Sequence, residues 1–230
     1  MTEPRRRAPR GQGAALRGEV LQAAMDLLRE TGDEASVSLR LVAQRVGVSV
    51  PAIYLHFEDK AALLDAVCEE VFGALHVAMK EASEGAPDAF QALRRQGIAY
   101  VRFALANPEH YRIVMMRSSA DHDVSDEIAG GAFSHLLDSV VACEELGVLE
   151  GDPVELGLRL WAGAHGIAAL LIAKPSFPWP PVEDLVERAV HAVGLGLAAA
   201  SRMPDVIGAE EVVTRLNRLR AESSPLGSET

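Results

Sequence analysis

Residues 38–60, SLRLVAQRVGVSVPAIYLHFEDK, bring together the side-chain types that contact a nucleic-acid duplex. Hydroxyl, phenol, imidazole and ammonium groups donate hydrogen bonds to phosphate oxygens, and an arginine can also pair bidentately with the edge of a guanine. Small apolar side chains can contact the methyl group of thymine. The side chains that could make these contacts are Ser38, Arg40, Ser49, Val50, Ala52, Tyr54, His56 and Lys60. The segment therefore predicts a DNA-binding surface, in which His56 could either donate to a phosphate or pack beside Phe57.

Two short helices joined by a tight turn must position these side chains. Apolar residues recur at helical spacing from Leu39 to Val46, and Ser38 precedes them as a capping residue. Gly47 can end this helix in the left-handed conformation. Pro51 falls in the first turn of the next helix, where its missing amide proton costs little. A turn that places glycine between two short helices is typical of the helix-turn-helix, whose second helix enters the major groove.

The same residues resemble a known signature. Residues 47–67 are similar to the tetracycline-repressor (TetR) family, in which Gly-Val-Ser, a Tyr, a His-Phe pair, a Lys and Ala/Leu-Leu follow one another. The matching residues here are Gly47-Val48-Ser49, Tyr54, His56-Phe57, Lys60 and Ala62-Leu63-Leu64. The resemblance extends over residues 16–71 and implies a DNA-binding regulator that is a dimer. Residues 160–166, LWAGAHG, also resemble a Trp-x-x-x-His-Gly string in the regulatory domain of one subgroup of this family.

The charge of the chain is unevenly distributed. The formal net charge is −11, yet residues 1–66 carry equal numbers of acidic and basic side chains. The whole excess of acidic groups therefore lies in residues 67–230. Because salt screens charges beyond about 8 Å, the local balance near a duplex matters more than the total. This distribution fits a DNA-binding head on an acidic body.

The composition predicts an all-α fold, with a three-helix helix-turn-helix head and a larger helical body for ligand binding and dimerisation. Long amphipathic stretches dominate, and only 5% of the residues are aromatic. No apolar segment of a secretory signal follows the N-terminal arginines, and the apolar stretches 162–173 and 192–200 are too short to span a bilayer. We therefore expect a cytoplasmic protein that does not enter the membrane. Cys68 and Cys143 lie among apolar residues and predict buried thiols, without a disulfide, metal site or cofactor.

The expected domain boundaries follow the breaks in helical pattern. Residues 1–12 predict a disordered basic segment, either an arm that reaches the DNA or a solubilising tail. The head spans residues 13–66, the body spans residues 67–203, and a weakly ordered tail spans residues 204–230. A long helix over about residues 59–83 links head and body. Further helices are expected at about residues 87–105, 124–146, 154–173 and 182–201, with a polar acidic loop at residues 118–126 and a weak helix at about 206–220.

The last two long helices have broad apolar faces rich in glycine and alanine. A helix-turn-helix needs two copies to read two half-sites about 34–36 Å apart, so this helix pair is the predicted dimer interface. The alternative is an ordinary core within one chain. The predicted interface residues are Leu156, Leu160, Gly163, Ile167, Leu170, Val186, Ala189, Val193 and Leu197.

Large aromatic and thioether side chains in the body predict an apolar ligand site. Methionine adapts to irregular apolar shapes, and ligand pockets usually carry only a few polar groups. The candidates are Tyr100, Phe103, Met115, Met116, Phe133, His135, Trp161 and His165. The alternative for each is a place in an ordinary core, and His165 could also bond a partner helix.

These features lead us to expect a ligand-responsive homodimeric transcriptional regulator, a repressor that a small, largely apolar effector releases from double-stranded operator DNA. Two other readings stay open. One is a DNA-binding regulator or nucleoid module controlled by a protein partner. The other is an enzyme with an accessory DNA-binding head, although the sequence contains no HExxH, nucleophile elbow or phosphate-binding loop. We therefore expect no enzymatic activity.

Overall fold

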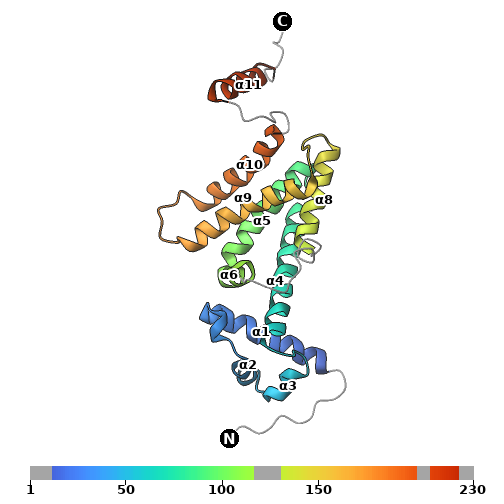
Figure 1. Cartoon of the computed structure of the whole chain (residues 1–230), viewed down its shortest axis with the longest axis vertical. Helices are drawn as coiled ribbons and strands as arrows, with labels where there is room; N and C mark the ends of the chain where they lie inside the picture. The colour runs from blue at the N-terminus through green and yellow to red at the C-terminus, as the bar shows by residue number, and fades with distance from the viewer. Residues whose placement is uncertain (1–11, 117–130, 201–207, 223–230) are drawn as a thin grey trace.

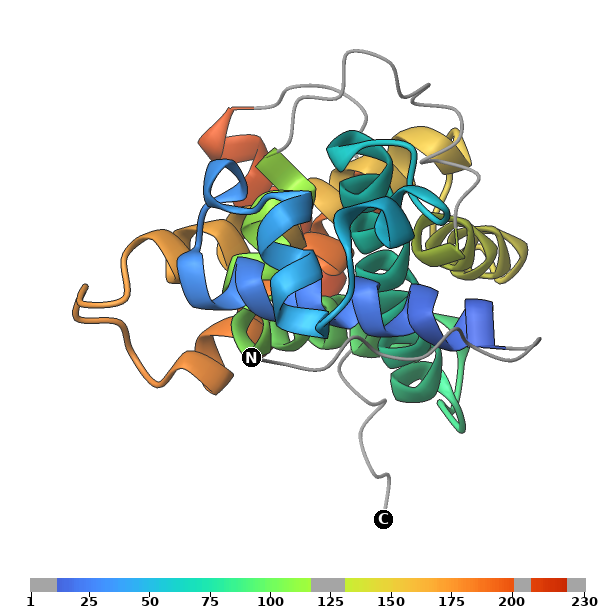
Figure 2. The same cartoon turned by 90° about the horizontal axis from the view of Figure 1, so that it is seen from below.

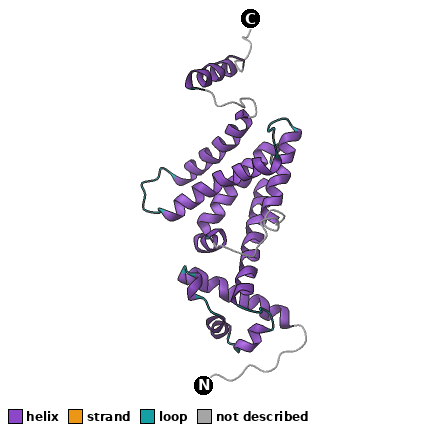
Figure 3. Ribbon diagram, viewed as in Figure 1, coloured by secondary structure: helices purple, strands orange, loops and turns teal. Residues whose placement is uncertain are grey.

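The computed structural model describes residues 12–116, 131–200 and 208–222. Within these ranges the regular elements are helices and no strand is present, which confirms the all-α fold (Figure 1, Figure 3). The elements are, in chain order, α1 (Gln12–Thr31), the 3-10 turn η1 (Glu34–Ser36), α2 (Leu39–Val46), α3 (Val50–Tyr54), α4 (Lys60–Ser83), α5 (Ala89–Ala106), α6 (Pro108–Met116), α8 (Gly131–Glu145), α9 (Pro153–Ala173), α10 (Val182–Ala200) and α11 (Ala209–Glu222).

Local capping chemistry determines where several of these helices begin. The Ser38 hydroxyl accepts a hydrogen bond from the Leu41 amide at 3.2 Å and caps α2. Asp59, Asp88 and Asp152 cap α4, α5 and α9 in the same way, each accepting from the amide three residues later at 2.8 Å. Such caps satisfy amides that have no partner inside the helix. Gly47 ends α2 at φ 77°, in the left-handed conformation that the sequence predicts.

The head is a small helical unit formed by α1, α2, α3 and the start of α4. Val20, Leu28, Ile53 and Leu63 are fully buried in one apolar core. This core reaches along α4 as far as Val71, and α1 lies across the first turns of α4 (Figure 1, Figure 2). The predicted three-helix head therefore includes the first three turns of α4.

The body packs around α5, which contacts α4, α8, α9 and α10. Two glycines permit this close packing. A Cβ atom on Gly97 would lie 2.7 Å from Val190 Cγ1, and one on Gly163 would lie 2.8 Å from Val193 Cγ2. Because real Cβ atoms do not approach so closely, glycine is required where α10 crosses α5 and α9. The helix over residues 59–83 does link the two units, since its second half belongs to the body core.

Several expectations differ from the structure in detail. The helix expected over residues 124–146 is described only as α8, from Gly131, and residues 117–130, with the expected acidic loop, lie outside the described residues. The proposed basic arm also lies outside them, except for Gln12 at the start of α1. The weak helix expected near residues 206–220 corresponds to α11.

The two cysteines form no disulfide and lie in different environments. Cys143 is fully buried, as predicted, and burial raises the pKa of its thiol to about 11. Cys68 is only partly buried, so the prediction of a fully buried thiol is wrong for this residue. Its position near the head end of α4 explains the difference, because α4 there presents one side to solvent.

Candidate DNA-binding surface and candidate effector site

The surface of the head that faces away from the body combines α2, the α2–α3 turn and α3 (Figure 2). Arg40 is exposed and makes no ion pair with any described residue. Ser49 occupies the capping position of α3, yet its side chain makes no capping hydrogen bond there. Tyr54 is 54% exposed at the end of α3. These three side chains therefore present free polar groups to solvent, as a DNA-binding surface requires.

Lys60 stands at the start of α4, but its ammonium group already has a partner. Lys60 Nζ donates to the Glu34 carbonyl oxygen of η1 at 2.6 Å. An ammonium group has three donors, so two remain for a phosphate oxygen. The contact also fixes α4 against the segment that leads into α2. Lys60 thus has a structural role that the sequence did not reveal, beside its predicted role toward DNA.

The remaining predicted residues divide into supporting and accessible positions. Val50 packs against the head core, and Ala52 is partly buried, so both contribute to holding α3 in place. Ser38 uses its oxygen as the cap of α2. His56 lies against the start of α1, where a Cβ atom on Gly13 would be 3.7 Å from His56 Cε1.

Two exposed residues were missed. Leu55 is 82% exposed beside Tyr54, although an apolar side chain at the end of a reading helix has no reason of stability to be there. Gln44 is exposed on α2, four residues after Arg40. The spacing of four residues places both side chains on one face of the helix, and this signal could have identified Gln44.

Other arginines of the head are engaged in the fold. Arg45 pairs bidentately with Glu30 at 2.9 and 2.7 Å, which joins α2 to α1 and lowers the pKa of the Glu30 carboxyl. The Arg17 guanidinium lies 5.1 Å from the centre of the Phe57 ring. Arg40 therefore remains the better candidate for a base or phosphate contact.

In the body, four aromatic side chains from α5, α6 and α9 form a hydrogen-bonded cluster, which we call the Tyr100 cluster. Tyr100 and Tyr111 are buried, and Trp161 and His165 are partly buried. Tyr111 Oη lies 2.6 Å from His165 Nδ1 and 3.1 Å from Tyr100 Oη. Tyr100 Oη accepts from Trp161 Nε1 at 3.0 Å and lies 3.3 Å from His165 Nδ1. The Met115 sulfur is 3.8 Å from the same phenol.

The Tyr100 cluster is electrically neutral at neutral pH. Burial raises the pKa of both phenols, and burial lowers the pKa of the His165 imidazole. The Tyr100 and Tyr111 hydroxyls, Trp161 Nε1 and His165 Nδ1 are thus held by neutral hydrogen bonds. A neutral polar group of a ligand could exchange with one of these bonds, whereas a charged group would have no buried counter-ion here.

The structure gathers five of the eight predicted ligand residues at this position. Phe133 completes the group, with its ring centre 6.1 Å from that of Trp161. Phe103 packs against both the head and the body cores, and the side chain of Met116 lies outside the described residues. Tyr111 was missed, although it stands four residues before Met115 and so shares a helix face with it.

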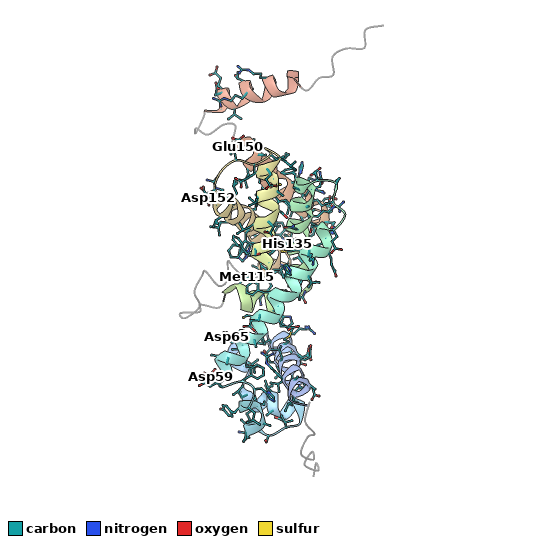
Figure 4. The ribbon with its side chains drawn as sticks, turned by 90° about the vertical axis from the view of Figure 1, so that its right-hand side faces the viewer. Asp59, Asp65, Met115, His135, Glu150 and Asp152 are labelled. Carbon is teal, nitrogen blue, oxygen red and sulfur yellow. The ribbon has the colours of Figure 1, made fainter. Side chains whose placement is uncertain are left out.

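His135 belongs to a different group of side chains. Its Nε2 atom lies 3.2 Å from Ser83 Oγ and 3.2 Å from Gln96 Nε2, between α4, α5 and α8. Met115 lies nearer to the head than His135 does (Figure 4). The predicted ligand residues therefore occupy two neighbouring positions along the body.

An open hollow on the surface between α5 and α10 does not match the expected apolar cavity. Charged and polar side chains line it, including Arg94 and Glu187, which form an ion pair at 3.0 Å. The predicted ligand residues lie elsewhere, so this hollow is not the candidate effector site.

The helix α6 joins the Tyr100 cluster to the head. His110 is only 4% exposed, and its Nε2 atom lies 3.0 Å from the Met25 carbonyl oxygen of α1. The next residue, Tyr111, bonds His165 in the body. A Cβ atom on Gly32, at the end of α1, would lie 3.1 Å from Glu109 Oε2 of α6. The sequence predicts α4 as the link between head and body, and the contacts of α6 add a second link that the sequence does not indicate.

The residues predicted for the dimer interface mostly face the interior of this chain. Leu156, Val186 and Leu197 are buried within it, and Gly163 packs on Val193. Leu160 and Ile167 pack against the same body core, and Ala189 is partly buried. Within one chain these eight residues therefore pack on or beside the body core, and the dimer interface itself stays a prediction. Leu170, 55% exposed, is the exception.

The outward face of α9 and α10 is also apolar. Leu158 and Leu195 are 41% and 47% exposed, and together with Leu170 they line this face. By length and composition α9 could cross a membrane, yet only 28% of its apolar window is buried within the chain. One such helix is weak evidence for a membrane span, and Glu155 and Arg159 form an ion pair on it.

Comparisons with known proteins identify both parts of the chain. Residues 20–67 match the family of bacterial regulatory proteins described as tetR family, and residues 93–193 match the tetracyclin repressor-like C-terminal domain. The tetracycline repressor protein class A of Escherichia coli is 46% identical over 57 residues, which are 25% of this chain and 26% of the repressor. The chain thus spans about a quarter of the length of the curated relatives that it matches.

Solved structures match over most of the chain. A protein of unknown function from Rhodococcus sp. RHA1 is 29% identical with a TM-score of 0.70, covering 86% of this chain and all of that one. A TetR family transcription regulator from Marinobacter aquaeolei VT8, 22% identical with a TM-score of 0.65, covers 81% of this chain and 97% of its own and shows the same fold. With its head and its body both matching the two parts of one family, the chain belongs to the TetR family of DNA-binding transcriptional regulators.

Proposed function

We propose that the protein is a cytoplasmic, homodimeric repressor that a small, largely apolar and uncharged effector releases from its operator. The observation that carries this proposal is the position of α6. Two adjacent residues of this helix bond the two units: His110 contacts the Met25 carbonyl in the head, and Tyr111 contacts His165 in the body. An effector that binds in the body can therefore change the position of the head through a single short helix, α6.

The composition of the outward face of α9 and α10 supports the dimer. Most of α9 is apolar, and the chain leaves several of its apolar side chains uncovered, among them Leu158 and Leu170. Gly166 and Gly196 lie inside helices, yet a Cβ atom on either would meet nothing within 4 Å. Glycine in a helix interior costs about 1 kcal/mol relative to alanine. Packing within one chain does not require glycine at these two positions. The close approach of a partner helix would require it.

The neutrality of the Tyr100 cluster supports an uncharged effector. A ligand hydroxyl or carbonyl that bonds His165 or Tyr111 competes with the 2.6 Å bond between them. Such competition favours an arrangement in which α6 has moved. The effector then shifts a population of two arrangements, and only its different affinities for them produce the shift. By linkage, operator DNA lowers effector affinity by the same factor.

The experiment is a two-stage measurement on the full chain. Selection of bound genomic fragments provides the operator, and a panel of neutral hydrophobic molecules is then scored by thermal shift and by operator release. A compound that stabilises the wild type should release its operator. In a His110→Leu variant the same compound should still stabilise the protein but should release the operator less.

Three outcomes contradict the proposal. If no DNA sequence is enriched, the protein has no specific operator. If compounds stabilise the protein but leave its operator affinity unchanged, they do not act as effectors. If the His110→Leu variant releases the operator normally, α6 does not couple the effector site to the head. A Gln22→Leu variant, which alters an exposed position on the same α1 helix, serves as the control and should release normally.

A further inference from the structure

A second polar cluster lies in the body, apart from the Tyr100 cluster. Gln96 of α5 is fully buried, and its Nε2 atom donates to Ser139 Oγ of α8 at 2.7 Å. The same nitrogen lies 3.2 Å from His135 Nε2. The His76 ring of α4 meets the His135 ring edge to face, with ring centres 5.5 Å apart. Three helices thus bring an amide, a hydroxyl and two imidazoles together.

Two polar atoms of this cluster are unpaired. Among the described residues, neither Gln96 Oε1 nor His76 Nδ1 has a hydrogen-bond partner, although both atoms are buried. Turning the Gln96 amide over would pair its oxygen and leave its nitrogen unpaired instead, so one end of the amide lacks a partner in either orientation. Buried polar groups in native proteins are almost always paired, because an unpaired group loses its hydration without compensation.

We propose that Gln96 and His76 form a binding subsite for a hydroxyl group of a neutral small molecule, an alcohol or a phenol. Both residues contact His135, and a hydroxyl both donates and accepts, so it can bond the unpaired end of the Gln96 amide or His76 Nδ1. This inference rests on the proposed effector function and specifies the polar group that the effector carries.

The electrostatics of the cluster exclude charged alternatives. Burial and the neighbouring His76 lower the pKa of the His135 imidazole, so it is neutral at neutral pH. The charged groups that act on His135 are Asp138 and Lys80, and both are exposed. Among the described side chains of this cluster there is no Asp, Glu, Lys or Arg, so a carboxylate or an ammonium ion would lose its hydration without one of these counter-ions beside it.

The position of the subsite relates it to the Tyr100 cluster. Gln96 and Tyr100 are one turn apart on the same face of α5, a rise of about 6 Å. On α8, Phe133 contacts Trp161 of the Tyr100 cluster, and His135 lies two residues further along. Residues two apart project from different faces of a helix, so the two clusters are related along α5, through Gln96 and Tyr100.

The test uses matched pairs of probes on the full-length dimer. Benzyl alcohol is compared with toluene, 2-phenylethanol with ethylbenzene, and para-cresol with para-xylene. Binding is measured by calorimetry, and the ring nitrogens of His76 are followed by ¹⁵N NMR, with a His76→Phe variant to assign them. We expect at least one alcohol to bind about tenfold more tightly than its hydrocarbon and to shift the His76 signals.

Two variants complete the design. Gln96→Met keeps the length of the side chain and should abolish the preference for the alcohol, while Gln91→Met, on the partly exposed surface of α5, should retain it. Equal binding of alcohols and hydrocarbons by the wild type, unshifted His76 signals with every alcohol, or a preference that persists in Gln96→Met would each overturn the subsite. Should Gln96→Met fail to fold, the wild-type His76 signals decide alone. Operator affinity of the ligand-free protein is measured separately, so that failure of the regulator function and failure of the subsite give different results.

Discussion

The replacement of Leu195 by alanine tests whether the outward face of α9 and α10 is the dimer interface. Full burial of a leucine side chain contributes about 1.5–3 kcal/mol. Leu195 is 47% exposed in the single chain, so the partner would cover about half of it, which contributes about 1 kcal/mol per copy. The two-fold axis doubles this to about 2 kcal/mol, and the dissociation constant of the dimer should rise about 30-fold.

Sedimentation of a dilution series measures this constant directly. At concentrations where both proteins are monomeric, the Leu195→Ala variant should have the same thermal stability as the wild type. Leu195 contributes little to the core of one chain. Val193→Ala is the matched control: Val193 packs on Gly163 within the chain, so this variant should lose thermal stability of the monomer and change the dimer constant less. Leu195→Asp, which places an unpaired charge in each half of the interface, should abolish the dimer.

The opposite pattern would refute the reasoning. If Leu195→Asp remains dimeric with normal operator affinity, the two heads are held by a surface other than α9 and α10. If Leu195→Ala lowers the stability of the monomer as much as Val193→Ala does, the side chain belongs to the intrachain core. Neither result would question the family of the chain, since that rests on the matches over residues 20–67 and 93–193.

Three further predictions concern the head and the Tyr100 cluster. Lys60→Ala should weaken binding to every operator sequence similarly and lower the salt slope by about one per subunit, and an unchanged slope in a salt titration would remove Lys60 from the DNA contacts. Tyr111→Phe should lower the free energy of unfolding by about 1 kcal/mol through loss of the bond to His165, whereas Tyr54→Phe on the surface should not, as chemical denaturation can measure. Acidification should lower thermal stability as the pH falls below about 6.5, the ordinary pKa of histidine. His135 and His165 have lowered pKa values in the folded protein, so the unfolded chain binds more protons there, and His165→Asn should flatten the profile.

Local chemistry made the boundaries of the helices predictable. Ser38 and Asp152 cap the helices that the sequence assigns to them, and Gly47 ends α2 with the positive φ that the turn requires. Each of these signals acts within three or four residues along the chain. The arrangement of the predicted DNA-binding residues has the same local origin, because Arg40 and Tyr54 lie on two short helices and Ser49 lies at the turn between them.

The orientation of α9 and α10 was not predictable in the same way. Leu156 and Leu158 are equally apolar neighbours, yet one is 6% and the other 41% exposed. Periodicity identifies a face only when the other faces are polar, and apart from Glu155, Arg159 and His165 the helix α9 is almost entirely apolar. The choice between the faces depends on where α5 and α8 lie, which is a contact between distant parts of the chain.

The geometry of α6 shows why the connection between head and body also escaped the sequence. Adjacent residues of a helix point about 100° apart, so a helix that lies between two units can place one side chain against each. His110 and Tyr111 do this, and no periodic pattern distinguishes such a pair from two ordinary polar residues. Both bonds belong to one short helix. A movement of α6 that changes the Tyr111–His165 distance therefore also changes the distance from His110 to the Met25 carbonyl oxygen. The close packing of α1 against α4 then carries that change to the whole head, since a densely packed core moves as a unit.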